Sequence, residues 1–218
     1  MKKLAKVLAA IILTTAVFFT AECMYAQTYN GHEYVDLGLP SGTLWATCNV
    51  GANSPEEYGD YFAWGETAPK DVYSWSTYQY YEGWNMTKYT WNERLTFLLP
   101  EDDAATANCG NGWRMPTEEE WHELYSNTTV TWTQQNGVNG RLFTASNGNS
   151  LFLPTAGYRW DSGLDDVGSN GGYWSSSLYT GYPYDAWGFG FSSDGYGVGV
   201  SVRYFGRSVR AVRSARQK

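Results

Sequence analysis

The sequence predicts an α+β fold dominated by antiparallel β-hairpins, with one clear helix and long, irregular, aromatic-rich loops. A capping-box motif opens a helical pattern at about residues 117–126. Short alternating segments separated by Asn-Gly and other glycine turns fill much of the second half of the chain. Aromatic residues make up 17% of the chain, with 11 Trp and 18 Tyr, which excludes a disordered polypeptide.

The N-terminus predicts a secretory signal peptide over residues 1–26. Three lysines precede the apolar run LAAIILTTAVFF, which is too short to span a bilayer comfortably. Cleavage is expected near Ala26 or near Cys23, and Glu22 makes lipid anchoring at Cys23 unfavourable. We therefore expect an exported protein, secreted or held at the outer surface, with one domain over residues 27–218 and no transmembrane segment in the mature chain.

Charge argues against nucleic acid as a partner. The formal net charge is −7, and removal of the leader takes away three lysines and makes the balance more negative. An acidic chain repels phosphate backbones. The C-terminus is a basic exception, and its arginines are expected to solvate a terminal strand and tail. These are Arg203, Arg207, Arg210, Arg213 and Arg216.

Two cysteines, Cys48 and Cys109, remain after the leader. Export makes a disulfide between them permissible, and two buried thiols are the alternative. Their spacing fits no metal site, and His32 and His122 are far apart in the sequence. No metal or cofactor is expected.

The first half of the chain predicts two strands and a long irregular excursion. Residues 32–39 and 43–50 alternate as strands around the turn LPSG. Residues 72–90 are dense in Tyr and Trp without a period, so they are expected to pack on their own aromatics. A weaker helix is expected at about residues 101–108, with Asp102 or Asp103 as its cap.

The clear helix follows at about residues 117–126. Thr117 is the expected N-cap, and Glu120 three residues later completes a capping box. Glu118 and Glu119 suit the positive end of the helix dipole. Trp121, Leu124 and Tyr125 fall on one face at helical spacing.

The remaining sequence predicts a β-meander and then C-terminal hairpins. In AWGFGFSSDGYGVGVSVRYFGRSVRAVR, residues 186–213, large residues alternate with glycine. Trp187, Phe189 and Phe191 share one face, and that apolar face is expected to bury against the helix. The glycines support two hypotheses equally: close packing against another segment, or a flat face left to solvent.

Several motifs carry a resemblance to known families. GWRMPTEEEWHEL resembles a segment of the formylglycine-generating-enzyme-like branch of the C-type lectin fold. YVDLGLPSGTLWATCNVGA, YGDYFAWGE, FLPTAGYR, YWSSS and RYFGRSVRAVR, in this order, resemble the Fibrobacter succinogenes major paralogous domain family, which is abundant in secreted proteins of Bacteroidetes-type bacteria. The resemblance covers nearly the whole mature chain and implies a C-type-lectin-like fold.

Some relatives of this fold are diversified by retroelements, which place hypervariable positions between framework residues of the C-terminal hairpins. The segment is similar to such a cassette, because Gly, Ser, Asp, Tyr, Val and Phe fill the intervening positions. The framework candidates are Trp187, Phe191, Arg203, Tyr204, Gly206, Ser208, Val209 and Arg210.

An enzyme is not expected. Formylglycine generation depends on reactive cysteines in the C-terminal part, and this chain has none after Cys109. Hydrolysis by a carboxylate pair is a weaker alternative, since capping explains Glu118 and Glu120, and Asp165 and Asp166 lie in a polar loop. Calcium-lectin motifs are missing, but aromatic stacking on a glycan needs no metal.

The sequence therefore predicts a secreted or cell-surface, non-catalytic ligand-binding domain whose partner is a glycan or a protein. Aromatic residues that anchor a ligand cluster at contact surfaces, so we expect the contact residues to lie in or beside the aromatic-rich C-terminal loops. A structural or assembly component of the cell surface, without a ligand of its own, is the alternative. The candidate contact residues are Tyr179, Tyr182, Tyr184, Asp185, Asp194, Tyr196 and Phe205.

Overall fold

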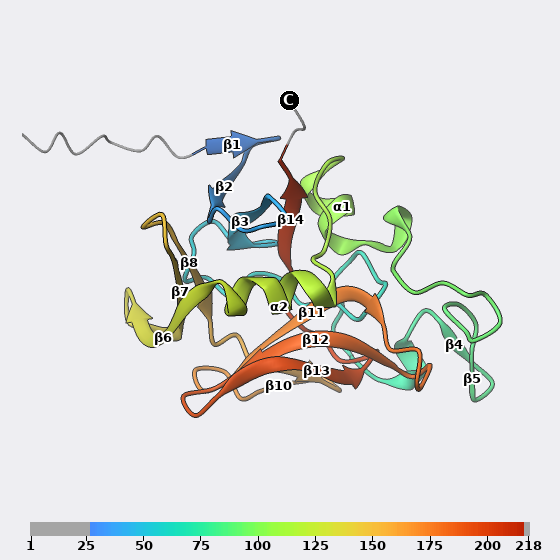
Figure 1. The fold of residues 1–218 in the computed structure, drawn as a ribbon. Coiled ribbons are helices and arrows are strands. Elements are labelled where there is room, and N and C mark those ends of the chain that lie inside the picture. The colour runs from blue at the N-terminus through green and yellow to red at the C-terminus, as the bar shows by residue number, and fades with distance from the viewer. Residues whose placement is uncertain (1–26, 216–218) are drawn as a thin grey trace, which may run out of the picture.

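The computed structural model describes residues 27–215 (Figure 1). The signal peptide expected over residues 1–26, including Cys23, lies outside the described residues. Within the described part, the helices are all too short or too polar to cross a membrane. The architecture consists mainly of antiparallel sheets with two α-helices, in agreement with the predicted α+β class.

The two ends of the described chain meet in a four-stranded sheet, β1-β2-β3-β14 (Figure 1). β3 pairs on one side with β2 and on the other with β14, so the last strand is held by one of the first. The strands are β1 (Gln27–Tyr29), β2 (His32–Asp36), β3 (Thr43–Asn49) and β14 (Arg210–Ser214). β2 and β3 confirm the two predicted N-terminal strands, whereas β1 was not predicted.

The excursion after β3 is irregular, as predicted. It contains a short 3-10 helix at Trp75–Thr77, the small hairpin of β4 (Tyr81–Glu82) and β5 (Asn85–Met86), and a second 3-10 turn at Pro100–Asp102. Aromatic side chains from this excursion fill one of the two hydrophobic cores. The fully or nearly fully buried ones are Tyr61, Phe62, Trp64, Tyr73, Tyr78, Tyr80 and Tyr89.

Both predicted helices form. α1 spans Ala104–Cys109, and the Asp103 side chain caps it by accepting from the Thr106 N–H at 2.9 Å. α2 spans Glu118–Ser126, with the capping box in place. Trp121 and Leu124 are buried on one face of α2, as their spacing indicates.

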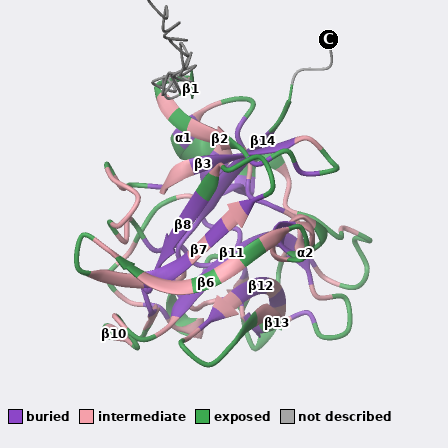
Figure 2. Cartoon of the chain, turned by 60° about the vertical axis from the view of Figure 1, so that its left-hand side comes forward, coloured by how far each residue is buried: buried purple, intermediate pink, exposed green. Residues whose placement is uncertain are grey.

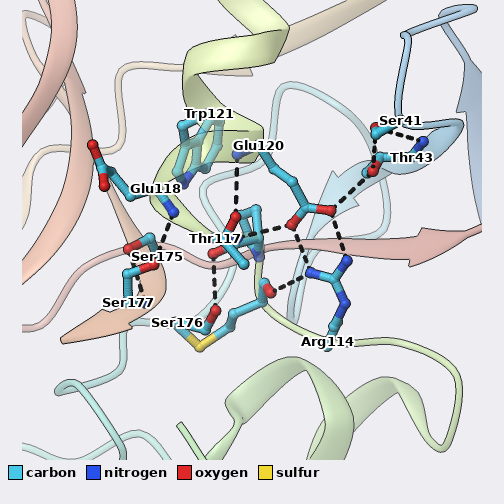
Figure 3. A network of polar contacts seen from close by, with 12 residues as sticks. Ser41, Thr43, Arg114, Thr117, Glu118, Glu120, Trp121, Ser175, Ser176 and Ser177 are labelled. Carbon is cyan, nitrogen blue, oxygen red and sulfur yellow. Dashed lines mark hydrogen bonds and ion pairs between the residues drawn. The ribbon is translucent and has the colours of Figure 1, made fainter. Parts of the chain in front are cut away.

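A polar network anchors the start of α2 to two sheets (Figure 3). Glu120 accepts from Arg114 Nη1 and Nη2, both at 2.6 Å, and from the Thr43 hydroxyl of β3 at 2.9 Å. The Glu118 N–H donates to the Ser177 hydroxyl of β11 at 2.9 Å. Burial alone would raise the pKa of Glu120, but the hydrogen bonds and charge of Arg114 outweigh burial and lower it.

The predicted meander follows α2. It comprises β6 (Thr128–Gln135), β7 (Val138–Ala145) and β8 (Ser150–Pro154), in that order in one sheet. A smaller antiparallel pair follows, in which β9 (Tyr158–Trp160) ends the predicted meander and β10 (Gly163–Asp165) lies in the expected polar loop.

The C-terminal sheet consists of β11 (Gly171–Leu178), β12 (Asp185–Phe191) and β13 (Tyr196–Val202), with β12 in the centre. α2 crosses one face of this sheet (Figure 1), where Phe189 stacks on Trp121 with ring centroids 5.0 Å apart. The prediction that the apolar hairpin face buries against the helix is therefore confirmed. β11 is buried along its whole length, while β13 is largely accessible (Figure 2).

Some glycines of this sheet permit close packing and others face open space, so each of the two hypotheses holds for part of the sheet. A Cβ at Gly188 would lie 2.5 Å from the Tyr173 carbonyl oxygen and 3.3 Å from Arg207 Nη1, so this glycine permits close packing. A Cβ at Gly197 or Gly199 would meet no atom within 4 Å, so these glycines keep an open face flat.

The expectation that the C-terminal arginines solvate the terminus is wrong for three of them, while Arg207 is half-buried and Arg216 lies outside the described residues. Arg203 and Arg210 are fully buried and Arg213 is 8% exposed. Arg210 donates to Asn49 and to two carbonyl oxygens of β3, and the Arg213 guanidinium lies 3.7 Å from the centroid of the Tyr29 ring. Aromatic faces and backbone carbonyls accommodate these cations in place of water.

Candidate functional site: a row of aromatic rings

The predicted contact residues occupy separate places around the C-terminal sheet. Tyr179, Tyr182 and Tyr184 lie in the loop that leads into β12. Asp194 and Tyr196 lie at the opposite end of the sheet, around the β12–β13 turn (Figure 1). A seven-residue strand separates the two ends by about 20 Å, so these residues do not form one contact patch.

The loop before β12 presents two tyrosines together. Tyr182 is 51% exposed, and its ring centroid lies 5.0 Å from that of Tyr184. The Tyr184 hydroxyl donates to the Trp84 carbonyl oxygen at 3.1 Å, which ties the loop to the β4–β5 hairpin. Tyr184 also meets Trp75 edge to face, with centroids 5.5 Å apart.

From Trp75 the ring contacts continue into the segment after β13. Trp75 lies 4.7 Å from Tyr204, and Tyr204 lies 5.0 Å from Phe205, both in edge-to-face geometry. Phe205 then stacks on Tyr158 of β9 at 5.3 Å. We call this continuous set the aromatic row. In spatial order it consists of Tyr182, Tyr184, Trp75, Tyr204, Phe205 and Tyr158.

The rings of the aromatic row are held on the core and still reach the surface. Every ring except the exposed Tyr182 is half-buried. Trp75, Tyr204 and Phe205 pack against the hydrophobic core beneath them. A surface held in this way loses little side-chain entropy when a ligand covers it.

Arg203 fixes the geometry at one end of the row. Its guanidinium lies 4.7 Å from the Trp64 ring centroid and donates to the Tyr78 hydroxyl at 2.9 Å. It also donates to the carbonyl oxygens of Pro183 at 2.9 Å and Lys88 at 3.2 Å. Pro183 stands between Tyr182 and Tyr184, so this framework arginine positions both rings.

The remaining candidates do not join the row. Tyr179 packs edge to face on Trp187 at 5.3 Å. Asp185 begins β12 half-buried, and burial raises its pKa. The exposed Asp194 accepts from the Ser193 hydroxyl at 3.0 Å. Tyr196 lies on the α2 face of the sheet, 5.7 Å from Tyr125.

Sequence reasoning missed three members of the row as contact residues. Tyr204 was assigned to the framework, and neither Trp75 nor Tyr158 was a candidate. No periodicity links the three, because tertiary contacts bring them together from three separate segments. The available signal was compositional: each lies in a short cluster of aromatic residues outside the predicted helix.

Acidic and nucleophilic groups near the core are occupied by structural partners. Asp102 accepts from Tyr80, Lys88 and Tyr89 at 2.5–2.6 Å. Burial alone would raise its pKa, but these three donors lower it. Among residues 27–215, no group of three or more His, Cys, Asp or Glu side chains is arranged to hold a metal ion.

Cys48 and Cys109 are free thiols in the structure. Both line a cavity of about 380 Å³ between β3 and the end of α1. Burial raises the pKa of Cys109 to about 11, so this thiol is protonated and a poor nucleophile at neutral pH.

Comparison with known proteins adds no relative to this description. No protein-family model matches the chain. Searches of curated proteins and of solved structures found no significant similarity. The candidate site is therefore defined by the geometry of the aromatic row.

Proposed function

We propose that this chain is a non-catalytic ligand-binding domain that acts at the cell exterior, with the aromatic row as its contact surface and a glycan as its ligand. The observation that carries this proposal is the row itself: six neighbouring rings with centroids 4.7–5.5 Å apart, all partly open to solvent. Such rings offer apolar faces to sugar C–H groups, and the tyrosine hydroxyls offer hydrogen bonds.

The support of the row by the core favours recognition over simple packing. A ligand-binding surface gains affinity when its side chains are ordered before the ligand arrives. Arg203 orders Tyr182 and Tyr184 through Pro183, and the core orders Trp75 and Phe205. The exposed Tyr182 is then the ring that a ligand covers first.

The non-catalytic part of the proposal is supported by the state of the acids. Glu120 is committed to Arg114 and Thr43, and Asp102 to Lys88 and two tyrosines. Asp165 and Asp166 lie near Tyr158, but adjacent acids on one loop do not flank a bond across a cleft.

We further propose that the fold is C-type-lectin-like and that the chain belongs to the Fibrobacter succinogenes major paralogous domain family. The sequence motifs carry this proposal. The pairing of β3 with β14 and the packing of α2 on the C-terminal hairpins support it. An experimental structure whose strand order differs from a C-type lectin domain would overturn it.

The retroelement hypothesis stays part of this proposal. Gly197 and Gly199 face open space and Tyr196 is 43% exposed, so these positions accommodate other side chains. A near-identical, Asn-rich template beside a reverse transcriptase gene is the expected genomic finding. A genome that lacks both would refute the hypothesis.

A second candidate function is a structural or assembly role at the cell surface. Trp84 is 84% exposed and Trp91 is 66% exposed, both on the irregular excursion and outside the aromatic row. Exposed tryptophans are typical of protein–protein contact surfaces. A protein partner that depends on these two residues, and not on the row, would favour this alternative.

The test is a screen of the protein on glycan and protein arrays, followed by variants. Tyr182→Ala and Phe205→Ala should each weaken glycan binding at least tenfold, because both remove a ring face from the row. Val200→Ala is the control, since Val200 of β13 is 43% exposed but belongs neither to the row nor to a cavity beside it. Loss of binding in the control alone would contradict the proposal.

A further inference from the structure

A cavity lies at the Tyr158 end of the aromatic row. Its volume is about 400 Å³, which is within the usual range for small-ligand sites. It opens between the β9–β10 region and the part of the C-terminal sheet where β12 turns into β13. Its walls include Tyr158, Asp166, Gly190, Ser192, Tyr196 and Arg207.

Arg207 brings an uncompensated positive charge to this cavity. Its buried Nε has no hydrogen-bond partner, and none of the ion pairs found among residues 27–215 involves it. Burial lowers its pKa to about 10, and only the nearby Tyr158 opposes that shift, so the guanidinium is charged at neutral pH. The residue is half-buried, and a partly desolvated cation without a partner costs stability, which an incoming anion would relieve.

The position of this guanidinium is built into the fold. The Arg207 backbone exchanges two hydrogen bonds with Phe62, both at 3.0 Å. The side chain then passes over two glycines: a Cβ at Gly172 would lie 3.7 Å from Arg207 Nε, and a Cβ at Gly188 would lie 3.3 Å from Arg207 Nη1. The guanidinium lies 5.0 Å from the centroid of the Trp174 ring. Glycines on the sheet therefore leave room for the arginine and keep it beside the cavity.

One acid, Asp166, lines the cavity without pairing with Arg207. Asp166 accepts from the Asn170 amide at 2.8 Å and has no hydrogen bond to Arg207. Burial raises the pKa of Tyr158, and the negative charges of Asp166 and Asp165 raise it further, so both carboxylates act near the cavity. At the Arg207 position these carboxylates disfavour a doubly charged group such as a phosphate monoester, but they tolerate a singly charged group such as a carboxylate.

We propose that this cavity binds an acidic sugar, of the uronic acid class, by its carboxylate. The proposal rests on the proposed glycan-binding function and deepens it. The Arg207 guanidinium receives the carboxylate, since its planar donors match carboxylate geometry. The Tyr158 ring packs on the pyranose and joins this site to the aromatic row, along which the neighbouring sugars lie.

The test is a titration of the protein with oligogalacturonate, its methyl ester and a neutral oligosaccharide of equal length. The acid should bind at least tenfold more tightly than the ester, because a charge-assisted contact is lost in the ester. Arg207→Gln should remove this preference while leaving the neutral oligosaccharide bound as before. Equal affinity for acid and ester, or a preference that persists in Arg207→Gln, would overturn the proposal.

A second variant tests the cavity independently in case Arg207→Gln does not fold. A Cβ at Gly190 would lie 3.9 Å from the Gly171 carbonyl oxygen and meet no closer atom outside the adjacent residues, so Gly190→Val is the substitution chosen to narrow the cavity while Arg207 stays in place. It should weaken binding of the acid at an unchanged melting temperature, and unchanged affinity would count against the site. Tighter binding of a carboxylate-terminated peptide than of oligogalacturonate would overturn the assignment to a sugar.

Failure of this inference can be told apart from failure of the proposed function. If neutral glycans bind in a Tyr182-dependent way but no acid preference appears, the acidic site is refuted and the aromatic row stands. If none of the three oligosaccharides and no glycan on the array binds, both proposals are refuted.

Discussion

Arg203 Nη1 donates a hydrogen bond of 2.9 Å to the carbonyl oxygen of Pro183, the residue between the two tyrosines that begin the aromatic row. The same guanidinium reaches Lys88 in the irregular excursion, so one side chain joins two loops that are far apart in the sequence. No carboxylate pairs with it in the described structure; it donates to carbonyl oxygens and to the Tyr78 hydroxyl, and aromatic rings lie over it.

Arg203→Met should destabilise the protein and also reduce the order of the tyrosines at the start of the aromatic row. The substitution keeps the apolar stem but leaves two buried carbonyl oxygens and the Tyr78 hydroxyl without their donor. We expect the free energy of unfolding to fall by about 3 kcal/mol. Urea denaturation measures this change, and glycan affinity should fall in a variant that is still folded. A change below about 1 kcal/mol would contradict this role.

Two glycines of the C-terminal sheet should respond in opposite ways to alanine. Gly188→Ala places a Cβ 2.5 Å from the Tyr173 carbonyl oxygen, so the backbone must shift, at a cost of about 2 kcal/mol. Gly199→Ala meets open space and should change the free energy of unfolding by less than about 0.5 kcal/mol. Thermal melts of the pair measure the difference, and equal effects would show that the sheet is packed differently.

The Glu120–Arg114 pair should make stability depend on pH. The folded pKa of Glu120 is lowered, so its contribution is present above the unfolded pKa of about 4.3 and is lost as pH falls through the folded pKa. Glu120→Gln should cost about 1 kcal/mol at pH 7.

That difference between the Gln variant and the wild type should shrink as the pH falls below about 4.3. Glu119→Gln, an exposed position on the same helix, is the matched control and should change the free energy of unfolding little at either pH. A Glu120→Gln effect that grows toward acid pH would contradict the ion-pair account.

The two cysteines should differ in reactivity when both are thiols. Because burial raises the pKa of Cys109 to about 11, a thiol reagent at pH 8 should modify it only after denaturation. Cys48 is half-buried and should react faster in the native protein. The Cys48→Ser and Cys109→Ser variants of the mature chain, each assayed beside the wild type with and without denaturant, separate the two. No reactive thiol in denaturant would instead demonstrate a Cys48–Cys109 disulfide.

The elements that sequence reasoning predicted are those with local causes. The capping box of Thr117 and Glu120 sets the start of α2, and alternation sets which face of β12 meets that helix. Both depend on residues within a few positions of each other, so one sequence suffices to find them.

The aromatic row had no such local cause. Trp75, Tyr158 and Phe205 come from three segments, and only the folded chain places them in line. Tyr196 shows the opposite case. Its alternation with Val198 and Val200 already assigns it to the helix face of the sheet, so the sequence held enough information to separate it from Phe205.

The arginines illustrate a further limit. Charge alone predicts solvent exposure, and that prediction failed for Arg203, Arg210 and Arg213 because aromatic rings and carbonyl oxygens cover them. A guanidinium is weakly hydrated and stacks on aromatic faces, so a chain this rich in Tyr and Trp can bury it.

The most direct test of the account is calorimetric titration of the strongest glycan from the array screen into the wild type, Tyr182→Ala and Val200→Ala. Tyr182 begins the aromatic row and is 51% exposed, whereas Val200 of β13 is 43% exposed and lies outside the row and the cavity beside it. The account predicts that Tyr182→Ala weakens binding at least tenfold at an unchanged melting temperature, while Val200→Ala binds as the wild type does. Full affinity in Tyr182→Ala, or a loss confined to Val200→Ala, would contradict the aromatic row as the ligand-binding surface.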